Sequence, residues 1–133
     1  MADGPLKWER EHIPDEDFLF RRVHESFLDE DDPDFIPPAI FRESKGNGGV
    51  SVDWNKYSTS NDARNRAREP ERNGIIEISA ISIRDVENLE VNHVPIFNNR
   101  AHSNIVGLNG LSKQKRTKAR WRLAQASSWV IKT

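Results

Sequence analysis

The chain of 133 residues contains no cysteine, which excludes disulfides, thiolate metal sites and cysteine nucleophiles. Without cysteine, and without the basic and apolar start of a signal peptide, the sequence indicates a cytoplasmic protein. No apolar run approaches the roughly 20 residues that a membrane helix needs, so we expect no membrane partner. Hydrophobic residues make up only 35% of the chain. This composition predicts a compact core with long polar loops.

Acidic residues are absent from the last part of the chain, although the net charge is only −1. Residues 1–40 contain 12 acidic and 4 basic side chains, whereas residues 101–133 contain 7 basic and no acidic ones. Four arrangements fit this asymmetry: a basic surface for nucleic acid, an acidic segment that folds back over that surface, oppositely charged faces that pair in a homodimer, or charge compensation within the fold. The sequence leaves all four open.

Three patterns that would bind a metal or a phosphate are incomplete. The acidic run at residues 29–34 lacks the spaced ligands, central glycine and distant glutamate of an EF-hand. The four histidines show no i, i+4 pairing of the kind found in zinc sites. The glycine-rich turn at residues 46–49 lacks the Lys-Ser/Thr pair of a phosphate loop. We therefore predict no metal site and no cofactor.

The first 14 residues carry few apolar side chains and two prolines, so we expect a flexible tail followed by one domain over residues 15–133. Alternating residues at 18–23 predict an opening strand, with Arg22 on one face and Arg21 on the other. Cleaner alternation at residues 50–54 predicts a half-buried strand. Its face away from the core carries Ser51 and Asp53.

The middle of the chain predicts a short helix and a long strand. Hydroxyl residues at 57–60 are typical of a helix cap, and residues 62–68 suit a short exposed helix that ends before Pro70. The most apolar segment, residues 74–83, predicts a central strand with a bulge near Ala80, where the alternation shifts phase. Shorter strands are expected at residues 89–91 and around residues 105–106.

Residues 113–131 have the clearest helical period in the chain. Ala119, Leu123, Ala126 and Val130 fall at i, i+4, i+7 and i+11, on a face that would pack on the sheet, and Trp121 lies on the far side. The elements together predict a single α+β domain, with a mainly antiparallel sheet, a short middle helix and a basic C-terminal helix packed on it.

A polar segment rich in asparagine lies between the predicted strands and the basic helix, at residues 95–107. Irregular segments of this kind, held between rigid elements, often carry binding or catalytic groups. The neighbouring elements place His102 near a sheet edge and the start of the helix, where backbone amides and cations could meet an anion. Alternatively, Asn99 and His102 simply tie the loop to the helix start.

Five separated blocks resemble, in one order, a family of small uncharacterised bacterial proteins: Arg21-Arg22, Phe41-Arg42, Ser51-Val52-Asp53, the segment Pro95…Asn99-x-Ala101-His102-x-x-Ile105-x-Gly107, and Leu123-Ala124…Trp129-Val130. The resemblance covers about residues 18–130. It implies a bacterial or phage origin and one domain, and it implies no activity. The acidic N-terminal part of the chain departs from the family pattern.

Two classes of function follow from these residues. The favoured one is a binding protein for nucleic acid or for an acidic protein partner, in which the basic helix neutralises phosphates and the loop adds hydrogen bonds. Trp121 would stack a base there, or simply cover a neighbouring loop. The residues concerned are Asn99, Arg100, Lys113, Lys115, Arg116, Lys118, Arg120, Trp121 and Arg122.

The alternative is an enzyme that acts on a nucleotide or on RNA. His102 would be the acid or base, Arg22 and Arg42 would hold an anionic group, and Ser51 would position the substrate. An arginine on the first strand and a serine on a later one remotely resemble ADP-ribosyltransferase-like folds. The glutamate of those enzymes has only a nominal counterpart in Glu77. This hypothesis requires His102, Arg22, Arg42 and Ser51 to converge on one cleft.

Overall fold

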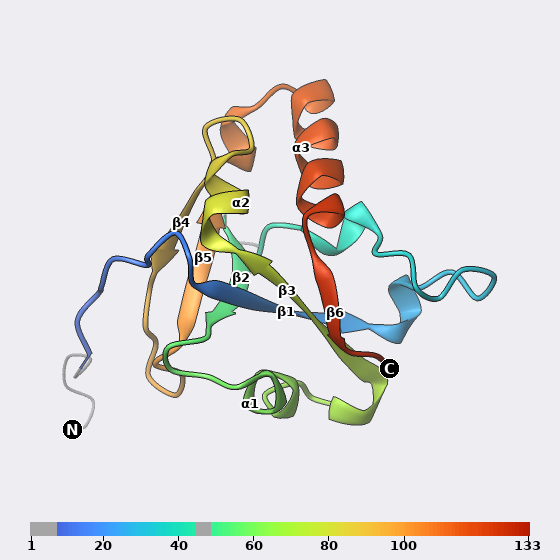
Figure 1. Ribbon diagram of the computed structural model, residues 1–133, viewed down its shortest axis with the longest axis horizontal. Helices are drawn as coiled ribbons and strands as arrows, with labels where there is room; N and C mark the ends of the chain where they lie inside the picture. Colours follow the sequence, from blue (N-terminus) through green and yellow to red (C-terminus); the bar gives the residue numbers. More distant parts are fainter. Residues whose placement is uncertain (1–7, 45–48) are drawn as a thin grey trace.

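The computed structural model describes residues 8–44 and 49–133, so the expected glycine-rich turn at residues 46–49 lies largely outside the described residues. One antiparallel sheet organises the chain, in the strand order β4-β5-β2-β1-β3-β6 (Figure 1). Its strands are β1 (Phe18–His24), β2 (Val50–Trp54), β3 (Asn73–Ser79), β4 (Glu90–His93), β5 (His102–Val106) and β6 (Ser128–Ile131). The α+β class and the antiparallel sheet expected from the sequence are confirmed.

The first two strands form as their alternation predicts. In β1, Leu19 and Val23 are fully buried, and in β2 the apolar positions that share their face are buried as well. Leu19 lies opposite Trp54 across the two strands, and Phe20 lies opposite Asp53. This register places all the polar positions of β2 on the same face as Arg22.

The apolar segment at residues 74–83 is a strand followed by a helix, and the prediction of one bulged strand is wrong at its C-terminal end. β3 ends at Ser79, and α2 (Ala80–Arg84) begins directly after it. The Ser79 hydroxyl accepts a hydrogen bond from the Ser82 amide at 3.3 Å and so caps the helix. Ala80 and Ile83 are buried three residues apart, which is helical spacing.

The predicted helix at residues 113–131 is also two elements. α3 (Lys113–Gln125) is capped by the hydroxyl of Ser112, and the chain then returns to the sheet as β6 beside β3. Ala119 and Leu123 are buried as predicted, whereas Ala126, which follows the last residue of α3, is exposed. Val130 is 41% exposed, since it belongs to the edge strand.

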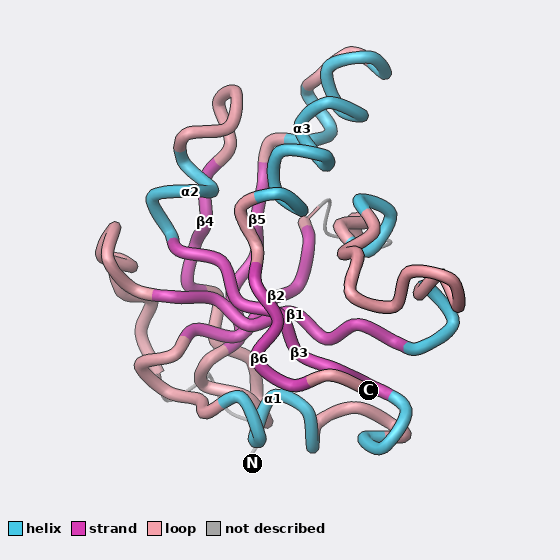
Figure 2. The backbone as a smooth tube through the Cα atoms, turned by 45° about the vertical axis from the view of Figure 1, so that its right-hand side comes forward, coloured by secondary structure: helices cyan, strands magenta, loops and turns pink. Residues whose placement is uncertain are grey.

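The sheet carries helices on both of its faces (Figures 1 and 2). α2 and α3 cover one face, together with a 3₁₀ turn at Pro38–Ile40, and the hydrophobic core lies beneath them. The short helix α1 (Ser60–Asn65) lies on the opposite face, against β1 and β3. Its cap is Thr59, whose hydroxyl accepts from the Asp62 amide at 3.0 Å. The polar face is therefore only partly covered.

The segment before β1 is attached to the domain. Ile13 is 1% exposed within the core, and the Glu11 amide donates to Nδ1 of buried His93 at 3.0 Å. The Glu11 carboxylate contacts Lys56 at 2.6 Å and accepts a hydrogen bond from the Tyr57 hydroxyl. Contacts of the domain thus begin before the boundary at residue 15 that the sequence predicts, and residues 1–7 of the expected tail lie outside the described residues.

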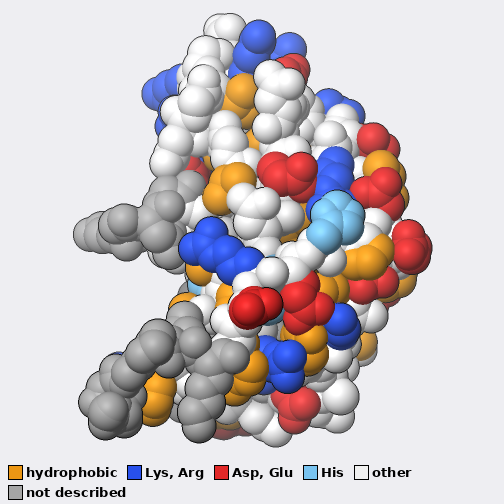
Figure 3. All heavy atoms as spheres, turned by 90° about the vertical axis from the view of Figure 1, so that its left-hand side faces the viewer, with side chains coloured by type: hydrophobic (Ala, Val, Ile, Leu, Met, Phe, Trp, Pro, Cys, Tyr) orange, Lys and Arg blue, Asp and Glu red, His pale blue; other side chains and the backbone are white. Residues whose placement is uncertain are grey.

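Ion pairs join the acidic N-terminal part of the chain to bases further along it. They include Glu11 with Lys56, Asp15 with Arg84 and Asp34 with Lys132. Figure 3 shows acidic and basic side chains interspersed over one face of the molecule. Charge compensation within the fold therefore accounts for part of the asymmetry along the sequence.

Candidate functional site

The polar face of the sheet gathers side chains from three neighbouring strands. β2 lies between β1 and β5, with Asp53 opposite Phe20 on one side and opposite His102 on the other. Ser51 and Arg22 project from the same face, because residues two apart in a strand point the same way. β5 is flanked by β4 and β2, so His102 lies on an interior strand. The sequence-based expectation that His102 lies near a sheet edge is therefore wrong.

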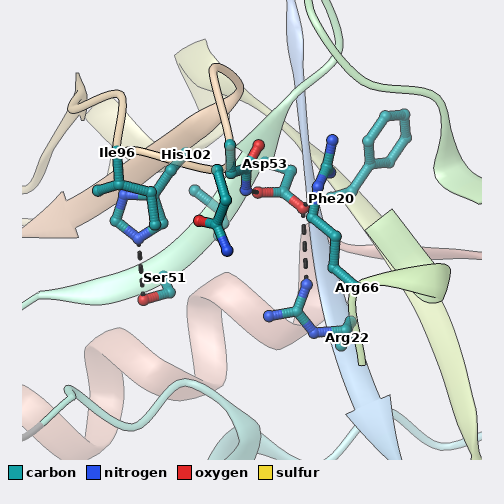
Figure 4. Close-up of a pocket in the computed structure, with 10 residues that line it drawn as sticks. Phe20, Arg22, Ser51, Asp53, Arg66, Ile96 and His102 are labelled. Atoms are coloured by element: carbon teal, nitrogen blue, oxygen red, sulfur yellow. Dashed lines mark hydrogen bonds and ion pairs between the residues drawn. The ribbon is translucent and has the colours of Figure 1, made fainter. Parts of the chain in front are cut away.

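A cavity of about 380 Å³ opens on this face. Its floor is formed by strand residues, and its walls by Arg66 just after α1 and by the turn at residues 96–99 (Figure 4). The lining residues are Phe20, Arg22, Ser51, Val52, Asp53, Arg66, Ile96, Asn98, Asn99 and His102.

A buried carboxylate holds the floor together. Asp53 is 3% exposed, and its Oδ2 lies 3.0 Å from Nη1 of Arg66 and 3.6 Å from Nη1 of Arg22. Its Oδ1 accepts a hydrogen bond from Nδ2 of Asn99 at 2.8 Å. One negative charge is shared by two guanidinium groups, so this cluster carries a net positive charge.

The guanidinium groups of Arg22 and Arg66 use only some of their hydrogen-bond donors within the described structure. Nη1 of Arg66 also donates to the Ser58 hydroxyl at 2.9 Å, and Nη1 of Arg22 donates to the Ala63 carbonyl at 3.1 Å. Within residues 8–44 and 49–133, neither Nε nor Nη2 of these two arginines meets an acceptor. Their side chains are 35% and 29% exposed and line the cavity, so both guanidinium groups are accessible to an anion.

The His102 ring is oriented by a backbone carbonyl. Nδ1 lies 2.9 Å from the Val94 oxygen, and because a carbonyl only accepts, Nδ1 carries the hydrogen. In the neutral ring, Nε2 is then the unprotonated acceptor. Nε2 lies 3.4 Å from Oγ of Ser51, on the cavity floor (Figure 4). His102 is thus presented with its lone pair toward a hydroxyl group.

Asn99 shapes the wall of the cavity. A tight turn joins Ile96 and Asn99, with reciprocal backbone hydrogen bonds of 3.1 and 3.0 Å. The Asn99 side chain donates to Asp53 and accepts from the Ala101 amide at 3.0 Å. Asn99 and His102 therefore fix this loop against β2 and Val94, whereas the sequence led us to consider the start of the C-terminal helix as their partner.

The structure brings together Arg22, Ser51, Asn99 and His102 from the residues singled out in the sequence, and it places Arg42 and Arg100 elsewhere. Arg42 is exposed after the 3₁₀ turn and does not line the cavity. The guanidinium carbon of Arg100 lies 4.1 Å from the centroid of the Tyr57 ring. The convergence that the enzyme hypothesis requires is therefore met only in part: Arg22, Ser51 and His102 line one cavity, Arg42 does not, and the second guanidinium group there belongs to Arg66.

The arginines of α3 bind other parts of the chain. Arg116 donates to the Leu108 and Leu111 carbonyls, and Arg122 donates to the Asp85 carbonyl at 2.9 Å. Arg120 forms an ion pair of 2.6 Å with Glu43. The lysines of the helix are exposed and have no acceptor within the described part of the chain: Lys113, Lys115 and Lys118.

Trp121 is 45% exposed on α3, as the helical period predicts. Its ring lies 5.8 Å from that of Phe35, and the two line a shallow groove of about 230 Å³. The aromatic pair is on the helix-covered side of the sheet, and neither ring lines the cavity of His102.

Two charged residues of the cavity were missed by sequence reasoning. Asp53 was placed on the correct face, but nothing in the alternation marked it as buried and paired. Arg66 was assigned to an exposed helix, although α1 ends at Asn65 and Arg66 turns onto the sheet. The signal present in the sequence was an acid on the same face as Arg22, which needs a cationic partner if it is buried.

Arg21 supports the cavity floor from the opposite face. Its Nη1 donates to the Ser51 carbonyl at 2.8 Å, and its Nη2 donates to the Ile40 carbonyl at 2.8 Å. Burial lowers the pKa of Arg21 to about 10, which leaves the guanidinium charged at neutral pH. The backbone beneath Ser51 is therefore held by a half-buried cation.

In residues 8–44 and 49–133, no group of three histidine, aspartate or glutamate side chains is placed to hold a metal ion. None of the described helices is long and apolar enough to cross a membrane. Comparisons of the chain with protein-family models, with curated proteins and with solved structures found no match. The candidate function accordingly rests on the geometry of the cavity.

Proposed function

We propose that the cavity is the active site of an enzyme that acts on a nucleotide or on RNA, with His102 as its general acid and base. The observation that carries this proposal is the His102 ring, whose Nδ1 is fixed on the Val94 carbonyl while Nε2 faces Ser51 in the cavity. A histidine in this arrangement takes a proton from a hydroxyl or water and returns it to a leaving group.

The charge of the cavity supports an anionic substrate. Arg22 and Arg66 share only Asp53, so one positive charge remains for a ligand. Guanidinium groups match phosphate oxygens with paired hydrogen bonds, and Nε and Nη2 of both arginines have no acceptor among the described residues. A volume of about 380 Å³ is within the range of small-molecule sites, which run from about 300 Å³ upward, and suits one nucleotide or the end of a chain.

Isothermal titration with adenosine, AMP and inorganic phosphate tests the binding step. We expect AMP to bind more tightly than adenosine, because only AMP carries the anionic group. Arg66→Ala should weaken AMP binding by about tenfold, since a hydrogen bond to a charged group is lost. Arg68→Ala is the matched control, because Arg68 is exposed two residues away and does not line the cavity.

Turnover of a chromogenic phosphodiester and a phosphomonoester tests the chemical step. His102→Gln should lower the rate by about a hundredfold or more while AMP still binds, because a general base is removed and the arginines remain. Equal binding of adenosine and AMP, or an Arg66→Ala variant that binds AMP normally, would contradict the proposed site.

A second candidate function follows from the exposed lysines of α3. Lys113, Lys115 and Lys118 have no acceptor in the described segments, and Trp121 is exposed on the same helix. We propose that this surface binds nucleic acid, and the alternative partner is an acidic protein. Each phosphate contact should make the logarithm of affinity fall by about 0.9 per logarithmic unit of salt.

Fluorescence anisotropy with labelled RNA and DNA, at several salt concentrations, separates the two candidates. Replacement of the three lysines by glutamine should abolish nucleic-acid binding in the second candidate and leave AMP binding in the cavity unchanged. Nuclease protection distinguishes nucleic acid from an acidic protein partner. No binding of RNA or DNA at low salt would remove this candidate.

A further inference from the structure

We propose that Ser51 is the nucleophile of the cavity and forms a covalent intermediate, an inference that rests on the proposed function. A serine hydroxyl becomes reactive when a neighbouring base accepts its proton. In the described structure, Oγ of Ser51 lies 3.4 Å from Nε2 of His102 (Figure 4) and 3.4 Å from Oγ of Ser44, and of these two partners only the imidazole is a base.

The orientation of this pair is determined at both ends. The Val94 carbonyl holds the Nδ1 hydrogen of His102 and so keeps the lone pair of Nε2 toward Ser51. This carbonyl occupies the position that a third group takes in hydrolases, where it orients the base. The backbone of Ser51 is fixed as well, because β2 is flanked on both sides by strands and the Ser51 carbonyl accepts a hydrogen bond from Arg21 at 2.8 Å.

Ser51 is also accessible. It is half-buried, and it lines the cavity together with Arg22 and Arg66. The negative charge that develops on a phosphoryl group under attack would therefore meet two guanidinium groups in the same cavity.

The reaction balances without a further reactant besides water. Oγ of Ser51 attacks the phosphorus, its proton passes to Nε2 of His102, and the bond to the leaving alcohol breaks as that oxygen takes the proton. A water molecule then attacks the phosphoserine and gives its proton to Nε2. The bond between phosphorus and Oγ breaks, and Oγ regains the proton. The net change is hydrolysis of one phosphate ester bond.

Labelling by a fluorophosphonate tests the nucleophile without knowledge of the substrate. The expected product is a phosphonylated Ser51 peptide, identified by mass spectrometry, with loss of fluoride. His102→Gln should slow labelling by about a hundredfold or more, and Ser51→Ala should abolish it. Ser44→Ala is the matched control, because Oγ of Ser44 is also 3.4 Å from Oγ of Ser51 but is not a base and does not line the cavity. The Ser44→Ala variant should be labelled at the wild-type rate.

A cysteine variant gives a second readout, and the natural chain contains no cysteine to confuse it. Ser51→Cys should react with iodoacetamide with a midpoint at least about one pH unit below the 8.5 of a free thiol, because the imidazole takes its proton. Adding His102→Gln should return the midpoint to the ordinary range. Circular dichroism confirms that each variant is folded.

Two results would overturn the inference: a fluorophosphonate that does not label the folded wild-type protein, or a Ser51→Cys thiol whose reactivity is unaffected by His102→Gln. Both outcomes are independent of AMP binding. A protein that binds AMP but is not labelled retains the proposed site and loses Ser51 as nucleophile. A protein that is labelled but does not bind AMP retains the nucleophile and loses the nucleotide substrate.

Discussion

Asp53 is the residue that joins the three sides of the cavity. Its carboxylate pairs with Arg22 of β1 and with Arg66 at the end of α1, and it accepts a hydrogen bond from Asn99 of the turn. Burial of a carboxylate is unfavourable unless its oxygens are hydrogen-bonded and its charge is paired, and both conditions are met here. A change at Asp53 should therefore affect stability as well as the position of both guanidinium groups.

Asp53→Asn should lower the free energy of unfolding by about 2 kcal/mol, measured by urea denaturation. The loss is kept below that of a fully buried pair because the two arginine side chains are about a third exposed and can be hydrated. Asp85→Asn makes the same charge change at an exposed position and should be close to neutral. Equal effects of the two substitutions would show that Asp53 does not hold the cavity together.

At the residue scale, residue type and alternation predict the candidate groups of the cavity better than the contacts that hold those groups in place. Ser51, Arg22 and His102 were singled out by their types and by alternation, and alternation also placed Ser51 and Arg22 on the correct face. Arg66 and the pairing of Asp53 depend on how α1 ends and turns onto the sheet. Such tertiary contacts leave no periodic signal in one sequence.

At the scale of elements, the sequence-based predictions are wrong where a strand and a helix with similar hydrophobic patterns follow one another directly. Ile81 and Ile83 continue the β-branched composition of β3, so nothing but the cap at Ser79 marks the change to helix. Val130 happens to extend the helical period of α3, although it lies on an edge strand. Strands with clean alternation, such as β2, were predicted with their bounds.

The pairing of β3 with the edge strand β6 depends on a glycine. A Cβ at Gly74 would lie 2.6 Å from the Ile131 carbonyl oxygen and 2.9 Å from the Trp129 ring. Gly74→Ala should therefore displace β6 and lower the free energy of unfolding by about 2 kcal/mol in urea titrations. Gly110→Ala, where a Cβ meets nothing within 4 Å, is the control and should change little.

Attachment of the N-terminal segment should depend on pH through Glu11. Hydrogen bonds from Lys56 and from Tyr57 lower the pKa of Glu11 below its ordinary value. A lowered carboxyl pKa means that this contribution is fully present above the ordinary value of about 4.3 and is lost as the pH falls through the lower, folded-state pKa.

The ring protons of Tyr57, the one tyrosine of the chain, report this transition by NMR. Their chemical shifts should change between about pH 4 and lower values in the wild type, and Glu11→Gln should show no such step. A step that persists in Glu11→Gln would assign the transition to another group.

At the scale of the whole molecule, the sheet divides the protein into an apolar layer beneath α2 and α3 and a polar layer that carries the cavity. The core continues beyond the sheet to Ile13, which is 1% exposed. The N-terminal segment thus contributes to the apolar layer, even though the composition of residues 1–14 predicts a tail.

Ile13→Ala should lower the free energy of unfolding by about 3 kcal/mol, because the substitution removes buried methyl and methylene groups and leaves a cavity. Ile81→Ala makes the same change at a side chain that is 41% exposed, and it should cost less than about 1 kcal/mol. Thermal unfolding of both variants provides the comparison. Similar losses would place Ile13 outside the cooperative unit.

Arg21 and Arg22 are consecutive residues that serve opposite faces of the sheet. Arg22 lines the cavity, and Arg21 reaches from the apolar layer to the carbonyl of Ser51. A displacement of Arg21 in the apolar layer would therefore shift the Ser51 hydroxyl on the opposite face of the sheet, because only the Ser51 backbone lies between them. Substitutions around Arg21 and Ile40 would thus shift the cavity floor while every group that lines the cavity stays intact.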